Sequence, residues 1–397
     1  MFSLKNKLDM NLRNALKNKL YKNYRVIIHC KALQNKVEQK LKTYRCEIIR
    51  SIPSIGCICS TISSGVIEKL IELPQIDYIT FDSFCLLCGS SVLSANGITF
   101  EKNYKLTGKN IGIGIIDTGV YPHPDLKKPG NRIVKFVDLI NNFNYPYDDN
   151  GHGTFTSGII ASSGESSNGM YRGVAEKSNI YMIKAFNRIG RGYVSDILFA
   201  LETLIVESSD HNLRIICLPF EMIDYNESIL TLFSTLFDKA IEKNISIIVP
   251  SGHNSNVENS MRGIALLKNC ITVGGIDNLR EKKPFLSSSA GSTGKSGKPD
   301  LCAVCVDICS LNSDTNYISE RNGQKVYPKH LETLYTNYTG TSCSAAFISG
   351  VCALLLENNP DLTYKDIVSL LKISCNLLNI PKNLQGAGII DIKKLLP

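Results

Sequence analysis

The chain has 397 residues, of which 43% are hydrophobic and 20% charged, and its formal net charge at pH 7 is +8. This composition is typical of a folded globular protein and excludes an intrinsically disordered chain. The length predicts one large domain together with a smaller one. Because no apolar run has the length of a signal-peptide core or of a membrane-spanning helix, we expect a cytoplasmic protein without a membrane span.

Positive charge is concentrated at the start of the chain. The first fifty residues contain 13 Lys or Arg against 3 Asp or Glu. Such segments can bind nucleic acid or anionic membranes. This one has neither an ordered alternation of basic and aromatic residues nor a known nucleic-acid-binding module, so we expect no nucleic-acid partner. We interpret it as a solvated face that complements a mildly acidic partner domain.

The fourteen cysteines indicate a reducing compartment. Most of them lie in apolar runs, where a thiol is a small hydrophobic group. Two pairs, Cys85 with Cys88 and Cys302 with Cys305, have the C-x-x-C spacing of a zinc or redox site. Neither pair has the turn-forming surroundings of a zinc knuckle, so we favour a structural role and predict no metal site.

The first part of the chain predicts a small α+β domain behind a basic tail. Residues 1–23 form the tail, which is helical or frayed over 1–20. Within 24–84 the pattern predicts strands at 25–30, 46–52, 56–61 and 76–81 and helices at 35–43 and 64–73. The order β-α-β-β-α-β is that of the ferredoxin-like unit.

Residues 85–110 are predicted to be a connector, because turn residues occur at 89–91 and 96–97. From 111 to 397, buried-strand patterns alternate with helical patterns. We predict strands at 111–116, 179–184, 214–218, 245–249 and 270–273, and helices at 154–161, 195–207, 229–243, 342–358 and 363–371. This alternation predicts an α/β fold with a mostly parallel sheet, helices on both faces and catalytic groups at the carboxyl ends of the strands.

Three glycine-bearing motifs predict a nucleophilic site. Asp117 ends an apolar strand in Asp-Thr-Gly, His152 lies in Asn-Gly-His-Gly-Thr, and Ser342 follows Gly-Thr at the start of an apolar helix. A serine hydroxyl becomes a nucleophile when an imidazole takes its proton and a carboxylate orients that imidazole. Taken singly, Asp117 could also be an aspartate that caps a turn, His152 a structural histidine and Ser342 an ordinary helix N-cap. Together, the order Asp, His, Ser is that of subtilisin.

The motifs resemble those of the subtilisin-like serine proteases (subtilases, peptidase family S8), in particular the intracellular AprX-like group of bacteria. Residues 117–126 and 147–154 are similar to the family's first two motifs, and 386–388 to its closing turn. The resemblance implies that Asp117 orients His152, that His152 is base and acid, and that Ser342 attacks the scissile carbonyl. It also implies that residues 24–84 are an inhibitory propeptide, with a processing site in the connector. Members of the family commonly bind calcium, but no carboxylate cluster in this sequence indicates where calcium would bind.

The sequence departs from the family pattern at the oxyanion hole. The family's asparagine follows Ala-Ala-Gly, whereas Pro-Ser-Gly here precedes His253 and Asn254. The donor is therefore either His253 or, after a shift of one residue, Asn254. Loss of such a donor lowers activity without abolishing it. Near Ser342, the family's helix proline is replaced by Ala346, and Phe155 replaces a second histidine.

The predicted substrate cleft departs as well. Subtilases bind a peptide as a strand between two enzyme segments. The first segment here contains Gly190, Arg191 and Gly192, and the second contains Pro219, Phe220 and Glu221 where the family has Ser-Leu-Gly. A proline removes a backbone donor, and bulky side chains replace glycines of a pocket wall. These changes predict narrow specificity, and Glu221 would favour a basic or polar P1 residue.

These features predict a serine endopeptidase that acts on protein or peptide substrates through an acyl-enzyme, with its own N-terminal propeptide as intramolecular inhibitor. One alternative is a pseudoprotease, a binding or regulatory protein that kept the triad while its cleft and oxyanion hole decayed. Another is a dedicated activator protease of the germination type, which also resembles this family.

Overall fold

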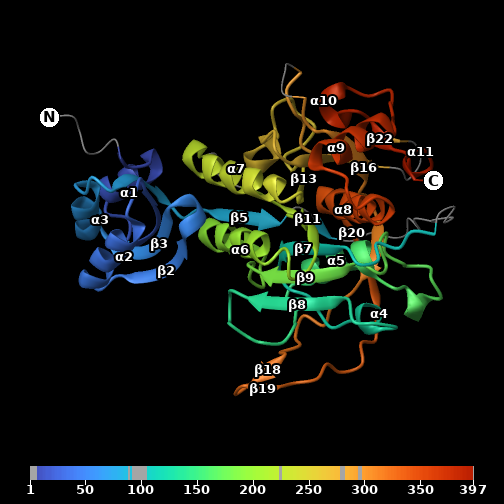
Figure 1. Ribbon diagram of the computed structural model, residues 1–397, viewed down its shortest axis with the longest axis horizontal. Coiled ribbons are helices and arrows are strands. Elements are labelled where there is room, and N and C mark those ends of the chain that lie inside the picture. The colour runs from blue at the N-terminus through green and yellow to red at the C-terminus, as the bar shows by residue number, and fades with distance from the viewer. Residues whose placement is uncertain are drawn as a thin grey trace.

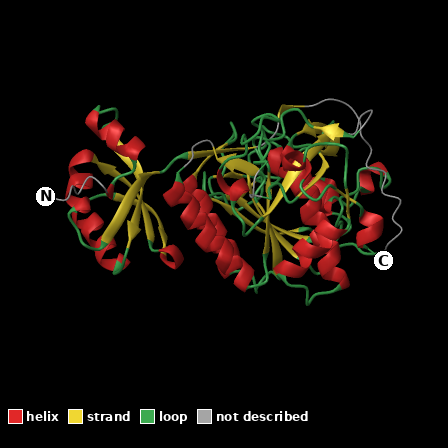
Figure 2. Ribbon diagram, turned by 90° about the horizontal axis from the view of Figure 1, so that it is seen from above, coloured by secondary structure: helices red, strands yellow, loops and turns green. Residues whose placement is uncertain are grey.

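The computed structural model describes residues 7–87, 90–91, 105–222, 226–277, 282–293 and 297–396, with the backbone alone for 84–87 and 90–91. A small N-terminal unit and a larger α/β unit lie end to end (Figures 1 and 2). The larger unit carries the three predicted motifs.

The N-terminal unit is an antiparallel sheet with the strand order β2-β3-β1-β4. Its elements are β1 (Asn23–Cys30), α2 (Gln34–Thr43), β2 (Glu47–Ile52), β3 (Cys57–Ser63), α3 (Ser64–Ile71) and β4 (Ile76–Phe81). This succession confirms the predicted ferredoxin-like order. Helix α1 (Met10–Lys17) precedes them and buries Leu12 and Ala15 in the same core, so part of the predicted tail is a packed helix.

The larger unit is built on a sheet whose strands are parallel from β8 to β22. In spatial order the strands are β21 (Cys375–Asn376), β22 (Ile389–Ile390), β16 (Leu301–Val304), β14 (Ile271–Asp277), β13 (Ser246–Pro250), β11 (Leu213–Cys217), β7 (Gly112–Asp117), β9 (Asn179–Lys184) and β8 (Ile133–Asp138). Strand β21 is antiparallel to β22, and the short β15 (Lys283–Pro284) is antiparallel to β14.

Helices cover both faces of this sheet. On one face, α5 (His152–Ala161) and α8 (Thr341–Asn358) pack against Ile113 and Ile115 of β7. On the other face, α6 (Val194–Val206) and α7 (Glu227–Glu242) share a core with Ile116. Because successive strand residues point to opposite faces, the continuous apolar runs of the sequence serve both cores. The predicted α/β fold is confirmed.

Helix α8 is the one helix of the described chain that is long and apolar enough to cross a membrane. In this structure 83% of that helix is buried inside the protein. Its composition is therefore that of a core helix against which β11, β13 and β14 pack.

The other elements lie at the edges of the large unit. They are α4 (Pro124–Lys127), β17 (Ile308–Leu311), β20 (Tyr335–Thr339), the hairpin of β18 (Glu320–Arg321) and β19 (Gln324–Lys325), α9 (Tyr364–Ile373), α10 (Lys382–Gln385), α11 (Ile392–Leu395) and 3₁₀ turns at Glu165–Ser167 and Gly263–Leu266. The 3₁₀ turn at Pro53–Ile55 belongs to the N-terminal unit, where it joins β2 to β3. Strands β17 and β20 pair, and β20 leads into α8 (Figure 1).

The predicted connector contains two short strands that the sequence did not predict. Strand β5 (Phe84–Leu87) lies between β10 (Arg191–Tyr193) and β12 (Phe220–Met222), antiparallel to both. Further on, β6 (Ser90–Ser91) pairs with β20. Turn residues mark where a chain bends but say nothing about distant strands that pair with it. The predicted turn at 96–97 lies outside the described residues.

Candidate active site

The aspartate of the first motif lies at the carboxyl end of β7. Asp117 is fully buried, and its Oδ1 accepts a hydrogen bond from the backbone N–H of Thr118 at 2.7 Å. The Thr118 hydroxyl in turn accepts a bond from the N–H of Gly153 at 2.9 Å. The turn after the strand therefore fixes the carboxylate and joins it to the next motif.

The histidine of the second motif is the first residue of α5. Its Nδ1 lies 2.8 Å from Oδ1 and 2.9 Å from Oδ2 of Asp117. Asp148 organises the start of this helix. One oxygen of its buried carboxylate accepts from the N–H of Gly151, and the other accepts from the N–H and the hydroxyl of Thr154. An acidic side chain at a helix N-terminus is favourable because unpaired N–H groups gather there.

The serine of the third motif is the second residue of α8. Its Oγ lies 3.1 Å from Nε2 of His152, so the three predicted residues form one line of hydrogen bonds. Ser342 and His152 are both buried, with 4% of each residue exposed. Burial raises the pKa of the adjacent Cys343 thiol to about 12. That thiol stays protonated near neutral pH and does not compete with Ser342 as a nucleophile.

The two candidates for the oxyanion donor lie in the loop that follows β13. Asn254 Nδ2 donates to Oε2 of Glu221 at 2.9 Å and lies 3.3 Å from Oγ of Ser289. His253 Nδ1 is buried and has no hydrogen-bond partner among the described residues. The loop is held at the N-terminus of α8, because the Thr341 hydroxyl donates to the carbonyl of Gly252 at 3.1 Å. The amide of Asn254 is therefore engaged, whereas one imidazole nitrogen of His253 is not.

The two predicted cleft segments lie on either side of β5. Arg191 and Gly192 are on β10, after the turn at Gly190, and they pair with Leu86 and Cys85. Glu221 is the middle residue of β12 and pairs with Leu86 from the other side. The structure thus brings both segments together around an extended chain.

The side chain of Phe220 does not form a wall of this cleft, which corrects the prediction. It is fully buried and its ring centroid lies 5.1 Å from that of Phe186, in the core shared with α6 and α7. Its neighbour Pro219 connects β11 to β12. Side chains alternate along a strand, so the inward position of Phe220 sends Glu221 toward the loop after β13.

No group of three or more His, Cys, Asp or Glu side chains in the described part of the chain is arranged to hold a metal ion. Cys302 and Cys305 belong to different core clusters, while Cys88 lies outside the described residues. The buried carboxylate of Asp138 accepts bonds from the N–H groups of Ile140 and Phe143 and from the Tyr147 hydroxyl. Because such donors repel a cation, this carboxylate does not suit calcium.

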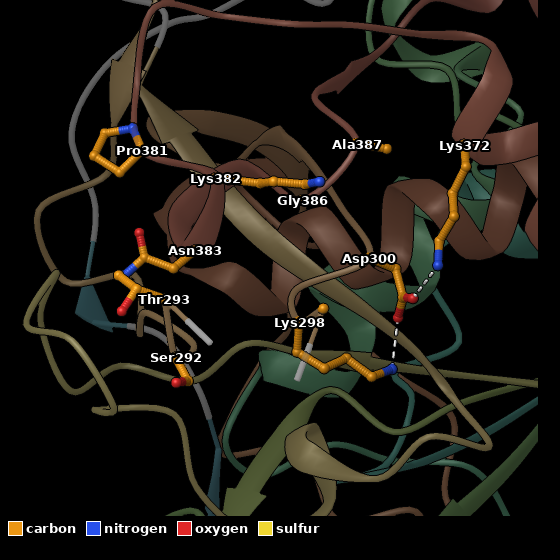
Figure 3. A pocket seen from close by; sticks show the side chains of 11 residues that line it. Ser292, Thr293, Lys298, Asp300, Lys372, Pro381, Lys382, Asn383, Gly386 and Ala387 are labelled. Atoms are coloured by element: carbon orange, nitrogen blue, oxygen red, sulfur yellow. Dashed lines mark hydrogen bonds and ion pairs between the residues drawn. The ribbon is translucent and has the colours of Figure 1, made fainter. Parts of the chain in front are cut away.

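A cavity of about 640 Å³ lies near the C-terminal end, lined in part by the predicted closing turn at Gly386 and Ala387 (Figure 3). Lys298 and Lys372 both reach the carboxylate of Asp300 there, at 2.6 and 2.8 Å. Burial alone would raise the pKa of Asp300, but the two ammonium groups lower it below its usual value. The triad residues do not line this cavity, and its buried ammonium, that of Lys298, is paired with Asp300.

Sequence reasoning missed Lys184 and Asp148. Lys184 ends β9, and its side chain is fully buried. Its Nζ donates to the carbonyl of Thr118 at 2.5 Å and lies 2.6 Å from Oδ1 of Asp149. A lysine that closes a buried apolar strand was the signal that could have identified it, since buried lysines need compensating partners.

A buried Asp–His–Ser line at the carboxyl edge of a parallel sheet is the arrangement of a subtilisin-like serine protease. The chain belongs to the subtilase family, because the sequence model of that family (Peptidase_S8) matches residues 108–388. It is 29% identical to serine protease AprX of Bacillus subtilis over 380 residues, covering 92% of this chain and 83% of that protein. It is 28% identical to subtilisin-like protease 1 of Plasmodium berghei over 305 residues, covering 70% and 48%.

Solved structures share the fold. Fervidolysin from Fervidobacterium pennivorans, a keratinolytic enzyme, matches with a TM-score of 0.72 and 17% identity, over 95% of this chain and 61% of that one. The epidermin leader peptide processing protease of Staphylococcus aureus matches with a TM-score of 0.70 and 18% identity, over 94% and 99%. The expected resemblance to subtilases, AprX included, is confirmed.

Proposed function

We propose that this subtilisin-like protease is an endopeptidase in which Asp117, His152 and Ser342 form the catalytic triad. The continuous hydrogen-bond line from Oδ of Asp117 to Oγ of Ser342 carries the proposal. Ser342 Oγ forms a bond to the scissile carbonyl carbon while His152 takes its proton. His152 then protonates the leaving amine as the C–N bond breaks, and water hydrolyses the acyl-enzyme by the same steps.

For the oxyanion we propose the N–H of Ser342, in the first turn of α8, and the side chain of His253. Backbone N–H groups in the first turn have no partner within the helix. The engaged amide of Asn254 and the unpartnered Nδ1 of His253 favour the histidine among the two predicted donors. Loss of the corresponding asparagine costs subtilisin about 2.7–4 kcal/mol, so we expect His253→Ala to lower kcat by about 10²-fold or more.

The N-terminal unit, residues 24–84, is proposed to be an intramolecular inhibitor, with residues 1–23 as its basic extension and 111–397 as the catalytic domain. Strand β5 lies between β10 and β12, as a substrate strand would, and this supports the proposal. Strand β6 then pairs with Tyr338 and Thr339, just before Ser342. Because β5 ends at Leu87 beside β12 and β6 begins at Ser90 beside β20, we propose that processing occurs between these two strands.

Narrow specificity, a protein substrate and a cytoplasmic location complete the proposal. Glu221 stands where the family has a glycine, and this larger side chain supports narrow specificity. The free thiols of the described chain are compatible with a reducing compartment. A preference for basic or polar P1 residues stays a prediction. The germination-type activator is the same reaction on one dedicated substrate, and calcium has no position in this proposal.

A pseudoprotease is the second candidate, and the engaged amide of Asn254 favours it. A fluorophosphonate probe separates the two, with Ser342→Ala as control and the amino terminus of the protein read by mass spectrometry. An endopeptidase is labelled at Ser342 or is cleaved between Leu87 and Ser91. The control for a blocked site is Arg25→Met, which removes the ion pairs of Arg25 with Asp82 and Asp196 and should loosen the N-terminal unit. If neither the wild type nor this variant is labelled and the chain stays intact, the endopeptidase is rejected.

A further inference from the structure

Glu221 contacts the loop that carries both oxyanion candidates. Its Oε2 accepts hydrogen bonds from the backbone N–H of His253 at 3.0 Å and from Nδ2 of Asn254 at 2.9 Å. One carboxylate oxygen thus holds two consecutive residues of the loop.

The loop is shaped to receive this carboxylate. Gly252 has a φ of +106°, a conformation that side-chain-bearing residues rarely adopt, and a Cβ on it would lie 2.5 Å from Oε2 of Glu221. Glycine is therefore required here by its backbone angle and by the space. The carboxylate packs directly on the main chain at the turn.

The same loop is tied to the nucleophile. Ser289 donates its backbone N–H to the carbonyl of Gly252 at 3.2 Å, and its hydroxyl accepts from the N–H of Asn254 at 2.9 Å. Thr341, the residue before Ser342, donates its hydroxyl to the same carbonyl of Gly252. Glu221, the loop and the start of α8 therefore form one connected structure.

We propose that Glu221 is a positioning residue that fixes the 252–254 loop and thereby holds His253 in place as the oxyanion donor. By accepting from Asn254, the carboxylate also withdraws that amide from the reaction. Because Glu221 lies on β12, the strand that pairs with β5, the segment that binds an extended chain is the one that fixes the oxyanion loop. This inference rests on the proposed function and specifies one residue of that site.

Positioning and P1 recognition predict different behaviour for the same residue. In Glu221→Gln, an amide oxygen can accept both hydrogen bonds, but the charge is lost. In Glu221→Met, the length is kept and the acceptor is lost. Positioning needs the acceptor, whereas recognition of a basic P1 residue needs the charge.

The test uses the full chain and two fluorogenic peptides that differ only in Leu or Lys at P1. We expect Glu221→Gln to stay within about threefold of the wild type on both peptides. We expect Glu221→Met to lose about 10- to 100-fold in kcat on both, with KM nearly unchanged, because a misplaced donor costs that much. If both variants lose activity equally, only on the Lys peptide and only through a higher KM, the inference is overturned in favour of P1 recognition.

Amide hydrogen exchange tests the inference even if the wild type is inactive. We expect exchange in the peptide containing His253 and Asn254 to become at least about tenfold faster in Glu221→Met and to stay unchanged in Glu221→Gln. Unchanged exchange in both variants overturns the inference. If the wild type and Arg25→Met are both unlabelled and the chain stays intact, the endopeptidase is rejected, but this exchange measurement can still judge Glu221.

Discussion

The ammonium of Lys184 lies 2.6 Å from Oδ1 of Asp149, and its hydrogen bonds join the turn after Asp117 to the segment before His152. The same ammonium is fully buried and donates to the carbonyls of Thr118 and Phe186. Thr118 follows Asp117 and Asp149 precedes His152 by three residues. The lysine thus acts as an internal cation that holds the aspartate turn against the start of α5.

Removal of the two partners should have unequal effects. In Asp149→Asn, Lys184 stays buried with its charge uncompensated, and we expect a loss of about 3–5 kcal/mol in the free energy of unfolding. In Lys184→Met, Asp149 can be hydrated, since 22% of its side chain is exposed, and the loss should be smaller. Urea unfolding of both variants checks this order, and a larger loss in Lys184→Met would contradict it.

A methyl group at Gly153 should disturb the site directly. A Cβ there would overlap the carbonyl oxygen of Gly119 and lie 3.2 Å from Cβ of Asp117. We expect Gly153→Ala to lose about 1–3 kcal/mol of stability and at least about tenfold in the rate of fluorophosphonate labelling. Gly65, in α3, is the matched control, because a Cβ there meets nothing within 4 Å. Gly65→Ala should be neutral or slightly stabilising, and similar losses in both variants would disprove the steric argument.

The sequence was sufficient to predict that Asp117, His152 and Ser342 lie together, because each of them lies at the boundary of an element in a local glycine motif. Contacts between distant segments have no such local signal. Lys184 meets Asp149 across 35 residues, and Glu221 meets Asn254 across 33, so tertiary packing alone brings them together. The sequence therefore could not choose between His253 and Asn254 as the oxyanion donor, because it does not show that the amide of Asn254 is already bonded to Glu221.

The same distinction applies to the secondary structure. The buried strands β7 and β9 were predicted within a residue of their bounds because their apolar runs are continuous. Strand β8 was missed, since it lies at the sheet edge and exposes Val134 and Lys135. Strands β10 and β12 have three residues each and depend on pairing with β5, which no local pattern encodes.

Arg25 should hold the N-terminal unit against α6. Its guanidinium lies 2.6 Å from Oδ2 of Asp82 and 3.0 Å from Oδ2 of Asp196, and it stacks 3.6 Å above the ring of Tyr193. Arg25→Met leaves two buried carboxylates without this cation, so we expect a loss of about 3 kcal/mol in the stability of the docked unit. Hydrogen exchange in β1 and β4 of the full chain measures it.

The matched control for Arg25 is Lys31, which pairs with Asp77 at 3.1 Å while 59% and 58% of the two side chains are exposed. Exposed ion pairs contribute about 0–1 kcal/mol, so Lys31→Met should leave exchange in β1 and β4 almost unchanged. If both variants exchange alike, the Arg25 contacts do not hold the unit.

The N-terminal unit should lose stability as the pH falls from about 6.5 to 4. Burial lowers the pKa of His29 to about 4, although the nearby Asp77 opposes this. Its Nε2 is buried without a hydrogen-bond partner among the described residues. Between an ordinary pKa of about 6.5 and the folded value, the unfolded chain binds a proton that the folded unit does not, which favours unfolding by at most about 3 kcal/mol.

Glutamine at position 29 isolates this effect, because it is neutral at every pH. The wild type should become less stable relative to His29→Gln as the pH falls, with most of the change between pH 6.5 and 4 and none above pH 7.5. Exchange of the β1 and β3 amides in the full chain measures the difference while carboxylates elsewhere affect both proteins equally. A constant difference from pH 7.5 to 4 would show that His29 is solvated and titrates normally in the folded unit.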